Sequence, residues 1–122
     1  MMIDYTLDQT KSVLYFRPTG PLQEKDFVAL SQAVNPFIER NRGLSGLLLE
    51  VAHFPGWTNL RAATQHFRFV HDHHRKIKKI AIVTDSLLGE AAEQIATHFV
   101  AATIKHFPFS HLDEAKNWVA ST

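Results

Sequence analysis

The chain has 122 residues, 45% of them hydrophobic and 20% charged, and this composition predicts one globular domain over residues 1–122 and excludes a disordered chain. Thirteen Lys and Arg against twelve Asp and Glu give a formal net charge of +1, which argues against nucleic acid or a membrane surface as a partner. The lack of cysteine excludes disulfides, thiolate chemistry and cysteine-based zinc sites, whereas eight histidines are unusual for this size. Asp4 and the absence of an apolar run near the N-terminus predict no signal peptide, and no run is long enough for a transmembrane segment, so we expect a cytoplasmic protein.

The first predicted elements are a β-hairpin and a helix. Residues 3–8 alternate between apolar and polar, which is typical of a strand with one solvated face, and residues 13–18 predict the second strand of the hairpin. Residues 27–38 carry apolar side chains at helical spacing. Because proline lacks an N–H and crowds the preceding turn, Pro36 is expected to kink or split this helix, and Gly43 is expected to end it.

The middle of the chain predicts two buried strands, each followed by a helix. The runs GLLLEVA (46–52) and KIAIVTD (79–85) are continuously apolar, as in strands covered on both faces. A long helix is expected between them, from about Thr58 to Ile77. An alanine-rich helix follows the second run, with Asp85 or Ser86 as its cap.

The last predicted elements are a short strand and a helix. Pro108 confines the strand KHFPFS to the edge of a sheet, and Ser110 with Asp113 resembles a capping box for the final helix. Because crossovers between parallel strands are right-handed, this order predicts an α/β fold. An N-terminal β-hairpin leads into successive βα units, and a mixed, mostly parallel five-stranded sheet packs with about four helices. In such sheets, ligand and partner contacts gather beyond the carboxyl ends of the strands.

Three segments, FPGWTNLRAA, KKIAIVTDSLLGEAAEQIA and DEAKNWV, lie in an order and at a spacing that resemble the SpoIIAA-like family of STAS-type domains. The resemblance covers essentially the whole chain. It implies a bacterial protein with the fold of the anti-sigma factor antagonists, which act through protein–protein contact, and an architecture related to lipid-carrying CRAL-TRIO domains. In the antagonists, a serine that follows an Asp at the start of the helix is phosphorylated. This chain has no Asp-Ser pair there, and its nearest hydroxyl is Thr58, so the phosphorylation switch does not transfer directly.

The segment HFPGWTNL, at the end of a buried strand, is the first candidate site. Gly56 belongs to a Pro-Gly turn, and Thr58 is suited to cap the next helix, a role that competes with phosphorylation. Trp57 either folds back over the core or is offered to a ligand or partner. His53 and Phe54 share these two alternatives.

The histidine-rich helix is the second candidate site. Its spacing separates a core stripe from a semi-apolar strip that contains His66, Phe69 and His73. An ordinary monomer surface has little need for such a strip, so we expect it to form a partner face, a subunit interface or the mouth of an apolar pocket. Histidine would make that contact sensitive to pH near neutrality. The predicted core stripe consists of Leu60, Ala63, Phe67, Val70, His74 and Ile77.

Three other chemistries are not supported by the sequence. Adjacent residues of the segment HDHH point about 100° apart on a helix and do not converge on one metal ion. A hydrolase would need a nucleophile in a recognisable elbow, and the chain has none. The basic run HHRKIKK is typical of a helix C-terminus, so we expect no nucleic-acid binding, and no cofactor is expected either.

Together these patterns predict a non-enzymatic STAS-like regulatory or protein-interaction module, with a homodimer as one form of contact. The alternative is a carrier of a small apolar or lipid-like ligand, held between the Trp57 loop and the alanine-rich helix, with Leu88, Ile95 and Phe99 as lining or as simple core. The predicted ligand or partner surface consists of His53, Phe54, Gly56, Trp57, Thr58, His66, Phe69 and His73.

Overall fold

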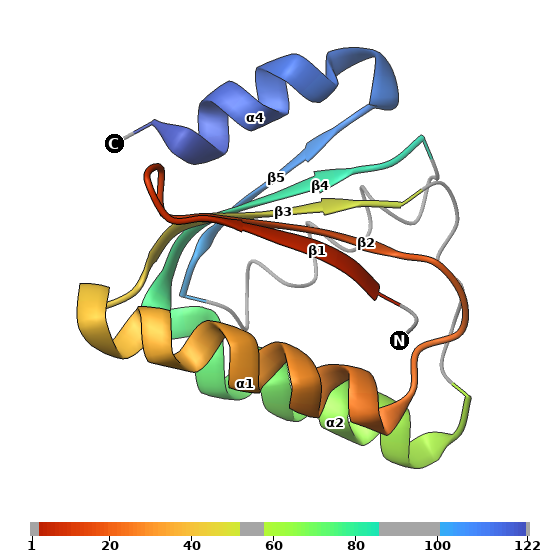
Figure 1. Ribbon diagram of the computed structural model, residues 1–122. Helices are drawn as coiled ribbons and strands as arrows, with labels where there is room; N and C mark the ends of the chain where they lie inside the picture. The colour runs from red at the N-terminus through yellow and green to blue at the C-terminus, as the bar shows by residue number, and fades with distance from the viewer. Residues whose placement is uncertain (1–2, 52–57, 86–100, 122) are drawn as a thin grey trace.

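The computed structural model describes residues 3–51, 58–85 and 101–121, and these form one five-stranded sheet (Figure 1). The first strand pairs antiparallel with the second, and every later pair is parallel. This arrangement confirms the predicted fold class. The order across the sheet is the chain order, β1 (Ile3–Asp8), β2 (Val13–Pro18), β3 (Leu44–Glu50), β4 (Ile77–Val83) and β5 (Thr103–Phe107).

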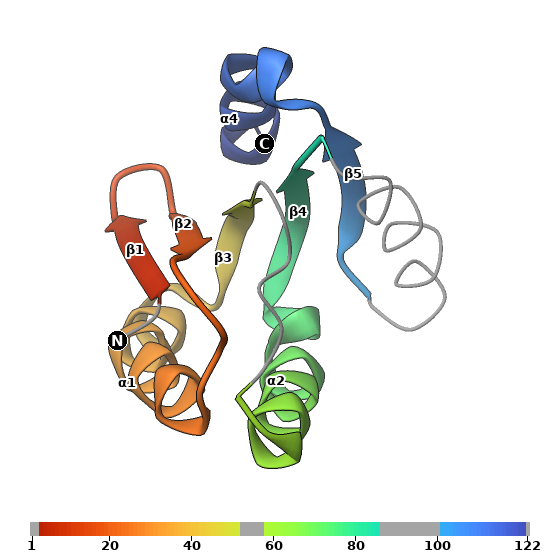
Figure 2. The same cartoon turned by 90° about the vertical axis from the view of Figure 1, so that its right-hand side faces the viewer.

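Helices cover both faces of the sheet. Two helices, α1 (Glu24–Asn41) and α2 (Leu60–His73), lie side by side below the sheet, and α4 (Leu112–Ala120) lies above it (Figures 1 and 2). Short 3₁₀ turns, η1 (His74–Lys76) and η2 (Phe109–His111), lead into β4 and α4. The predicted alanine-rich helix falls on residues 86–100, outside the described residues. No helix in the described ranges combines the length and the apolar character needed to cross a bilayer.

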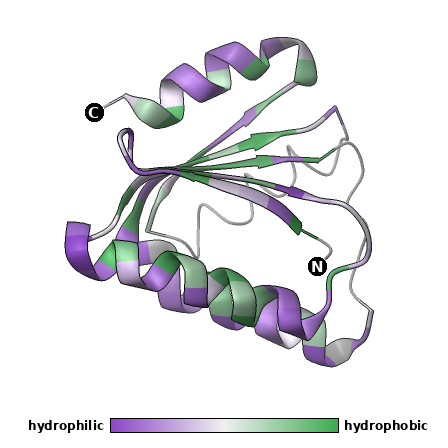
Figure 3. Cartoon of the chain, in the orientation of Figure 1, coloured by the Kyte–Doolittle hydropathy of each residue, from purple (hydrophilic) through white to green (hydrophobic). Residues whose placement is uncertain are grey.

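The sheet separates two hydrophobic cores, because successive side chains of a strand point to opposite faces. The larger core lies between the sheet and the α1–α2 layer, and the smaller one lies under α4. Neighbouring residues of β2 show the division, since Leu14 belongs to the first core and Val13 to the second. In Figure 3 the central strands β3 and β4 carry mostly apolar residues, whereas the outer strands β1 and β5 and the two ends of α1 are more hydrophilic.

The α1 helix runs unbroken through Pro36, so the expected split does not occur. Val34 and Phe37, on either side of the proline, are both buried, and this packing holds the helix across the missing hydrogen bond. The helix ends at Arg42, which takes a left-handed conformation with φ of 60°. The Gly43 N–H then donates to the Ile38 carbonyl at 3.1 Å, as in a Schellman ending.

The helix starts differ from the predictions. The cap of α2 is Asn59, whose Oδ1 accepts the Ala62 N–H at 2.9 Å, whereas the Thr58 N–H donates to the Leu22 carbonyl at 2.8 Å. The predicted capping role of Thr58 is therefore wrong. The long helix also ends earlier than expected, since Ile77 is the first residue of β4.

The predicted capping box of the last helix is also wrong, because η2 occupies Phe109–His111 and α4 has no side-chain cap. A comparable bond lies instead at the start of α1, where Asp26 Oδ2 accepts the Gln23 N–H at 2.8 Å. Asp26 is fully buried, so this bond holds the carboxylate at the point where the chain enters the helix.

Candidate functional site

The structure describes four of the eight predicted site residues. His53, Phe54, Gly56 and Trp57 lie outside the described residues, as do Leu88, Ile95 and Phe99 of the alternative carrier site. Thr58 is exposed at the start of α2, where its backbone bond to Leu22 ties the segment to the chain entering α1.

The strip predicted to face a partner is largely inside the molecule. Phe69 is 8% exposed and His73 is 4% exposed, and Ala62 on the same strip is fully buried. The expectation of an outward-facing strip is therefore wrong for these residues. The physical reason is that α2 packs against α1 as well as the sheet, so it buries a wider arc than one core stripe. Of the predicted core stripe, the side chains of Leu60, Ala63, Phe67 and His74 are outside the description, Val70 is half-buried and Ile77 is buried in β4.

His73 is held by both ring nitrogens. Its Nδ1 lies 2.7 Å from the Phe69 carbonyl oxygen, and its Nε2 lies 2.7 Å from Oδ1 of Asn35 on α1. The ring also stacks on Phe69 with centroids 4.2 Å apart. Burial lowers the pKa of His73, and this effect outweighs the opposing effect of the Phe69 carbonyl. Lys76 also lowers this pKa, while Asp72 raises it.

His66 is half-buried one heptad before His73 on α2. Its ring stacks on Phe27 of α1, with centroids 5.0 Å apart and an interplanar angle of 18°. Burial lowers the pKa of His66, because the charged ring would lose its hydration. By contrast His71 lies at the surface, with a side chain 85% exposed and Nδ1 3.3 Å from Asp72 Oδ1. Among the described residues, no three His, Asp or Glu side chains form a group suited to a metal ion.

The outer seam between α1 and α2 carries three adjoining hollows of about 650, 340 and 250 Å³. Each pair of hollows shares lining residues: Glu24 joins the first and second, Val28 and Gln32 join the first and third, and Gln65 joins the second and third. The three therefore form one continuous depression, which we call the α1–α2 trough. The α1 side contributes Gln23, Glu24, Lys25, Phe27, Val28, Ala29, Ser31, Gln32 and Asn35, and the α2 side contributes Thr58, Asn59, Arg61, Thr64, Gln65, Arg68, Phe69 and Asp72.

The trough combines an exposed apolar side chain with charged edges. Val28 lines two of the three hollows and is 46% exposed, although an exposed β-branched residue gains nothing inside a helix. Arg61 and Arg68 lie one heptad apart on α2, and Lys25 lies on α1. Thr58, the exposed member of the predicted site, lies at the end of the trough where both helices begin.

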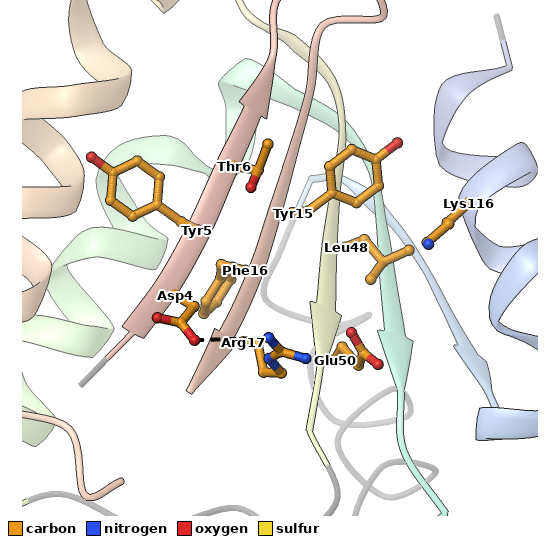
Figure 4. A pocket seen from close by; sticks show the side chains of 9 residues that line it. All are labelled: Asp4, Tyr5, Thr6, Tyr15, Phe16, Arg17, Leu48, Glu50 and Lys116. Carbon is orange, nitrogen blue, oxygen red and sulfur yellow. Dashed lines mark ion pairs between the residues drawn. The ribbon is translucent and has the colours of Figure 1, made fainter. Parts of the chain in front are cut away.

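A second depression, of about 380 Å³, lies on the opposite face of the sheet beside α4 (Figure 4). The Tyr15 ring and Leu48 lie between the strands and Lys116, which reaches in from α4. Arg17 and Glu50, on neighbouring strands, close one end, and Arg17 Nη2 lies 3.8 Å from Asp4 Oδ2. The depression arises because α4 packs on β3 and β4 and leaves β1 and part of β2 uncovered (Figure 2).

The chemistry of this second depression is balanced in charge. Arg17 and Lys116 bring positive charge, and acidic residues on β1 and β3 bring negative charge. Burial, and to a lesser extent the charge of Asp8, raises the pKa of Tyr15, so its hydroxyl stays protonated and can donate a hydrogen bond.

Comparisons with known proteins place the chain in a family. A family model described as SpoIIAA-like matches residues 13–120. The chain belongs to the SpoIIAA-like family. Its fold is similar to that of an uncharacterised protein with a SpoIIAA-like fold, from the DUF3478 family of Shewanella loihica PV-4, known from a crystal structure. The two share 20% sequence identity with a TM-score of 0.80, over 96% of this chain and 93% of the other. No curated protein matches the sequence.

Within this SpoIIAA-like fold, sequence reasoning identified only Thr58 and Phe69 of the residues that line the α1–α2 trough, and Val28 and Asn35 are among those that it missed. Val28 follows Phe27 directly and falls outside the helical pattern of core positions in α1. An apolar residue outside that pattern could have indicated an exposed apolar site. Asn35 carried no comparable signal, because its contact with His73 spans 38 positions in the sequence.

Proposed function

We propose that this single STAS-like domain, residues 1–122, is a non-enzymatic interaction module of the bacterial cytoplasm that binds another protein through the α1–α2 trough. The observation that carries the proposal is the exposure of Val28 in a trough with Arg61, Arg68 and Lys25 at its edges. Membership of the SpoIIAA-like family supports the general mode of action.

The trough defines the chemistry of the partner. Because Val28 is 46% exposed, an apolar partner side chain over it would gain about half of the roughly 1.5–3 kcal/mol that burial of a fully exposed valine is worth. Arg61 and Arg68 are separated by two helical turns and stand on one ridge of α2, so carboxylates spaced along a partner segment would pair with both. Glu24 and Asp72 at the same edges would repel a partner that is acidic throughout.

The experiment places a photo-crosslinking amino acid at position 28 of the full chain, in cells that naturally carry it. Position 5 is the matched control, since Tyr5 is the other large apolar side chain exposed in the described part of the chain, at 38%. We expect crosslinking to a defined protein from position 28 only. We also expect Arg61→Glu with Arg68→Glu to abolish it.

Other outcomes decide between the alternatives. Crosslinks from position 28 to a second copy of the chain would identify the homodimer as the partner. A bound lipid in native mass spectra, with no protein crosslink at position 28, would replace the proposal with the carrier function. Equal crosslinking from positions 5 and 28 would show that the trough is not a specific contact.

In isolated protein, Val28→Glu tests the same surface without a crosslinker. The side chain is exposed and glutamate favours helices more than valine does, so we expect the melting temperature to stay within about 2 °C of the wild type. We expect the crosslinked partner, once purified, to bind this variant at least about tenfold more weakly, measured by calorimetry. Unchanged affinity would remove Val28 from the contact.

A further inference from the structure

Both ring nitrogens of His73 lie within hydrogen-bond distance of an oxygen atom, and a neutral ring can donate to only one of them. Nδ1 lies 2.7 Å from the Phe69 carbonyl, and a carbonyl oxygen only accepts hydrogen bonds, so Nδ1 carries a proton. A neutral imidazole has only one N–H, so Nε2 must then accept. The atom 2.7 Å from Nε2 is Oδ1 of Asn35, which accepts as well.

Two arrangements satisfy every atom. When His73 is neutral, the Asn35 amide must present its NH₂ group to Nε2. When His73 is charged, both ring nitrogens donate, and Oδ1 of Asn35 must face Nε2. The amide groups have nearly the same shape, so one arrangement converts to the other by turning the amide over, with little movement of other heavy atoms.

We propose that His73 and Asn35 form a proton-dependent switch, in which the Asn35 amide turns over whenever His73 gains or loses a proton. The pair joins α2 to α1, and the His73 ring is fixed by Phe69 as well, so the amide is the part free to turn.

The groups around the ring act on the pKa of His73 in both directions, and their net effect, dominated by burial, is to lower it. Burial disfavours the imidazolium, and Lys76 in η1 repels it. Asp72 on α2 and the Phe69 carbonyl favour it. From α1 the ring is met by the uncharged Asn35 amide, which stabilises either form according to its orientation.

The switch has a consequence for the surface, and this step rests on the proposed function of the α1–α2 trough. Asn35 lines the 250 Å³ hollow together with Phe69 and Asp72. The neutral ring engages the amide NH₂ and leaves the carbonyl oxygen for the trough. The charged ring engages that oxygen and leaves the NH₂ donor for the trough. Acidification would therefore replace an acceptor by a donor beside Asp72 and favour a partner that presents a carboxylate.

The test is a pH titration of the full chain, labelled with ¹⁵N, followed by NMR from pH 8 to pH 5. At pH 8 we expect His73 to be neutral with the proton on Nδ1. As Nε2 becomes protonated, the side-chain amide signals of Asn35 should shift with the same midpoint as the ring. The switch would be overturned if the His73 ring carried its proton only on Nε2 at pH 8. It would also be overturned if the chemical shifts of the Asn35 side-chain amide did not change while the ring titrates.

The variant Asn35→Asp provides an independent test, because a carboxylate of the same shape can only accept from Nε2 and favours the charged ring. We expect the midpoint of His73 to rise by about one pH unit or more, a tenfold gain in proton affinity. Gln32→Glu is the matched control, because it makes the same amide-to-acid change on the exposed part of the trough. It should move the titration midpoint of His73 by about a few tenths of a pH unit at most.

Equal midpoints in the two variants would contradict the coupling between His73 and Asn35. If Asn35→Asp does not fold, the wild-type titration still decides the matter. Neither readout requires a partner. Failure of the switch would therefore leave protein binding at the trough untouched, and failure of the crosslinking experiment would leave the switch standing.

Discussion

At the scale of single residues, Gly46 lies where the backbones of β3 and α4 approach each other closely. A Cβ atom at this position would lie 2.5 Å from the Val119 carbonyl oxygen and 2.8 Å from the Val119 Cβ on α4. Backbone cannot rotate away as a long side chain can, so Gly46→Ala must displace α4 from the sheet. We expect a loss of about 1–3 kcal/mol in the free energy of unfolding, measured by urea denaturation. Ser45→Ala, the preceding residue of β3, is the control and should cost less than half as much.

Single-residue roles were the least predictable from the sequence. Thr58 and Asn59 are both good capping residues, and the choice between them depends on where α2 begins, which the contact between Thr58 and Leu22 fixes. The capping pair of the last helix failed for a similar reason. The Phe109 N–H donates to Asp85 Oδ1, just after β4, at 2.9 Å. Phe109 is the first residue of η2, the turn that occupies the position where the capping box was expected.

At the scale of elements, α4 is held at its carboxyl end by a lysine from β4. Lys79 Nζ donates to the carbonyl oxygens of Trp118 and Ser121, each at 3.2 Å, and to Ser121 Oγ at 2.6 Å. The same ammonium lies 5.3 Å from the centroid of the Trp118 ring. A cation at this position compensates the negative end of the helix dipole and the last free carbonyls.

Lys79→Met removes this charge and keeps most of the aliphatic chain. We expect the free energy of unfolding to fall by about 1 kcal/mol, and amide exchange to become faster within α4 while α1 is unaffected. Lys78→Met, at the exposed neighbouring position of β4, is the matched control and should leave exchange in α4 unchanged. A uniform increase of exchange throughout the chain would show that Lys79 supports the whole fold and not α4 in particular.

Element order was predictable, whereas the faces of α2 were not. Period-2 alternation in residues 3–8 and continuous apolar runs near residues 46 and 79 identify strands from local sequence alone. The burial of Phe69 and His73 depends on a second helix lying beside α2, and that neighbour is far away in the sequence. A helix that packs against both a sheet and another helix buries side chains on two of its sides. Residues that border the predicted core stripe can therefore be buried as well.

At the scale of the whole molecule, the mixed, mostly parallel sheet could be predicted, because right-handed crossovers make the strands of successive βα units parallel, but the order of the strands across the sheet was not predicted. The strands stand in chain order with β3 at the centre. Where the surface is left open depends on helix placement, which the sequence does not report. In the described part of the chain, α4 packs on β3 and β4 and leaves β1 uncovered on one face, and the pair α1 and α2 creates a seam on the other.

The sensitivity of the free energy of unfolding to acid depends on the whole fold. The α1 and α2 helices together bury the rings of His66 and His73, and burial disfavours their charged forms. Burial holds the pKa of His66 below its ordinary value of 6.5, so the unfolded chain takes up this proton at a higher pH than the folded chain does. The contribution of His66 to stability is therefore complete above pH 6.5. It declines as the pH falls below that value, by at most about 1.4 kcal/mol per pH unit, and stops changing below the folded-state pKa.

His66→Phe keeps the aromatic contact with Phe27 and removes the proton. We expect the free energy of unfolding, from urea titrations at pH 8 and pH 5, to fall less on acidification in this variant than in the wild type. His71→Gln should keep the wild-type fall, since that side chain lies at the surface. The same fall in wild type and in His66→Phe would mean that His66 binds its proton equally in the folded and unfolded chain. The acid sensitivity would then have to come from groups outside the stacked pair.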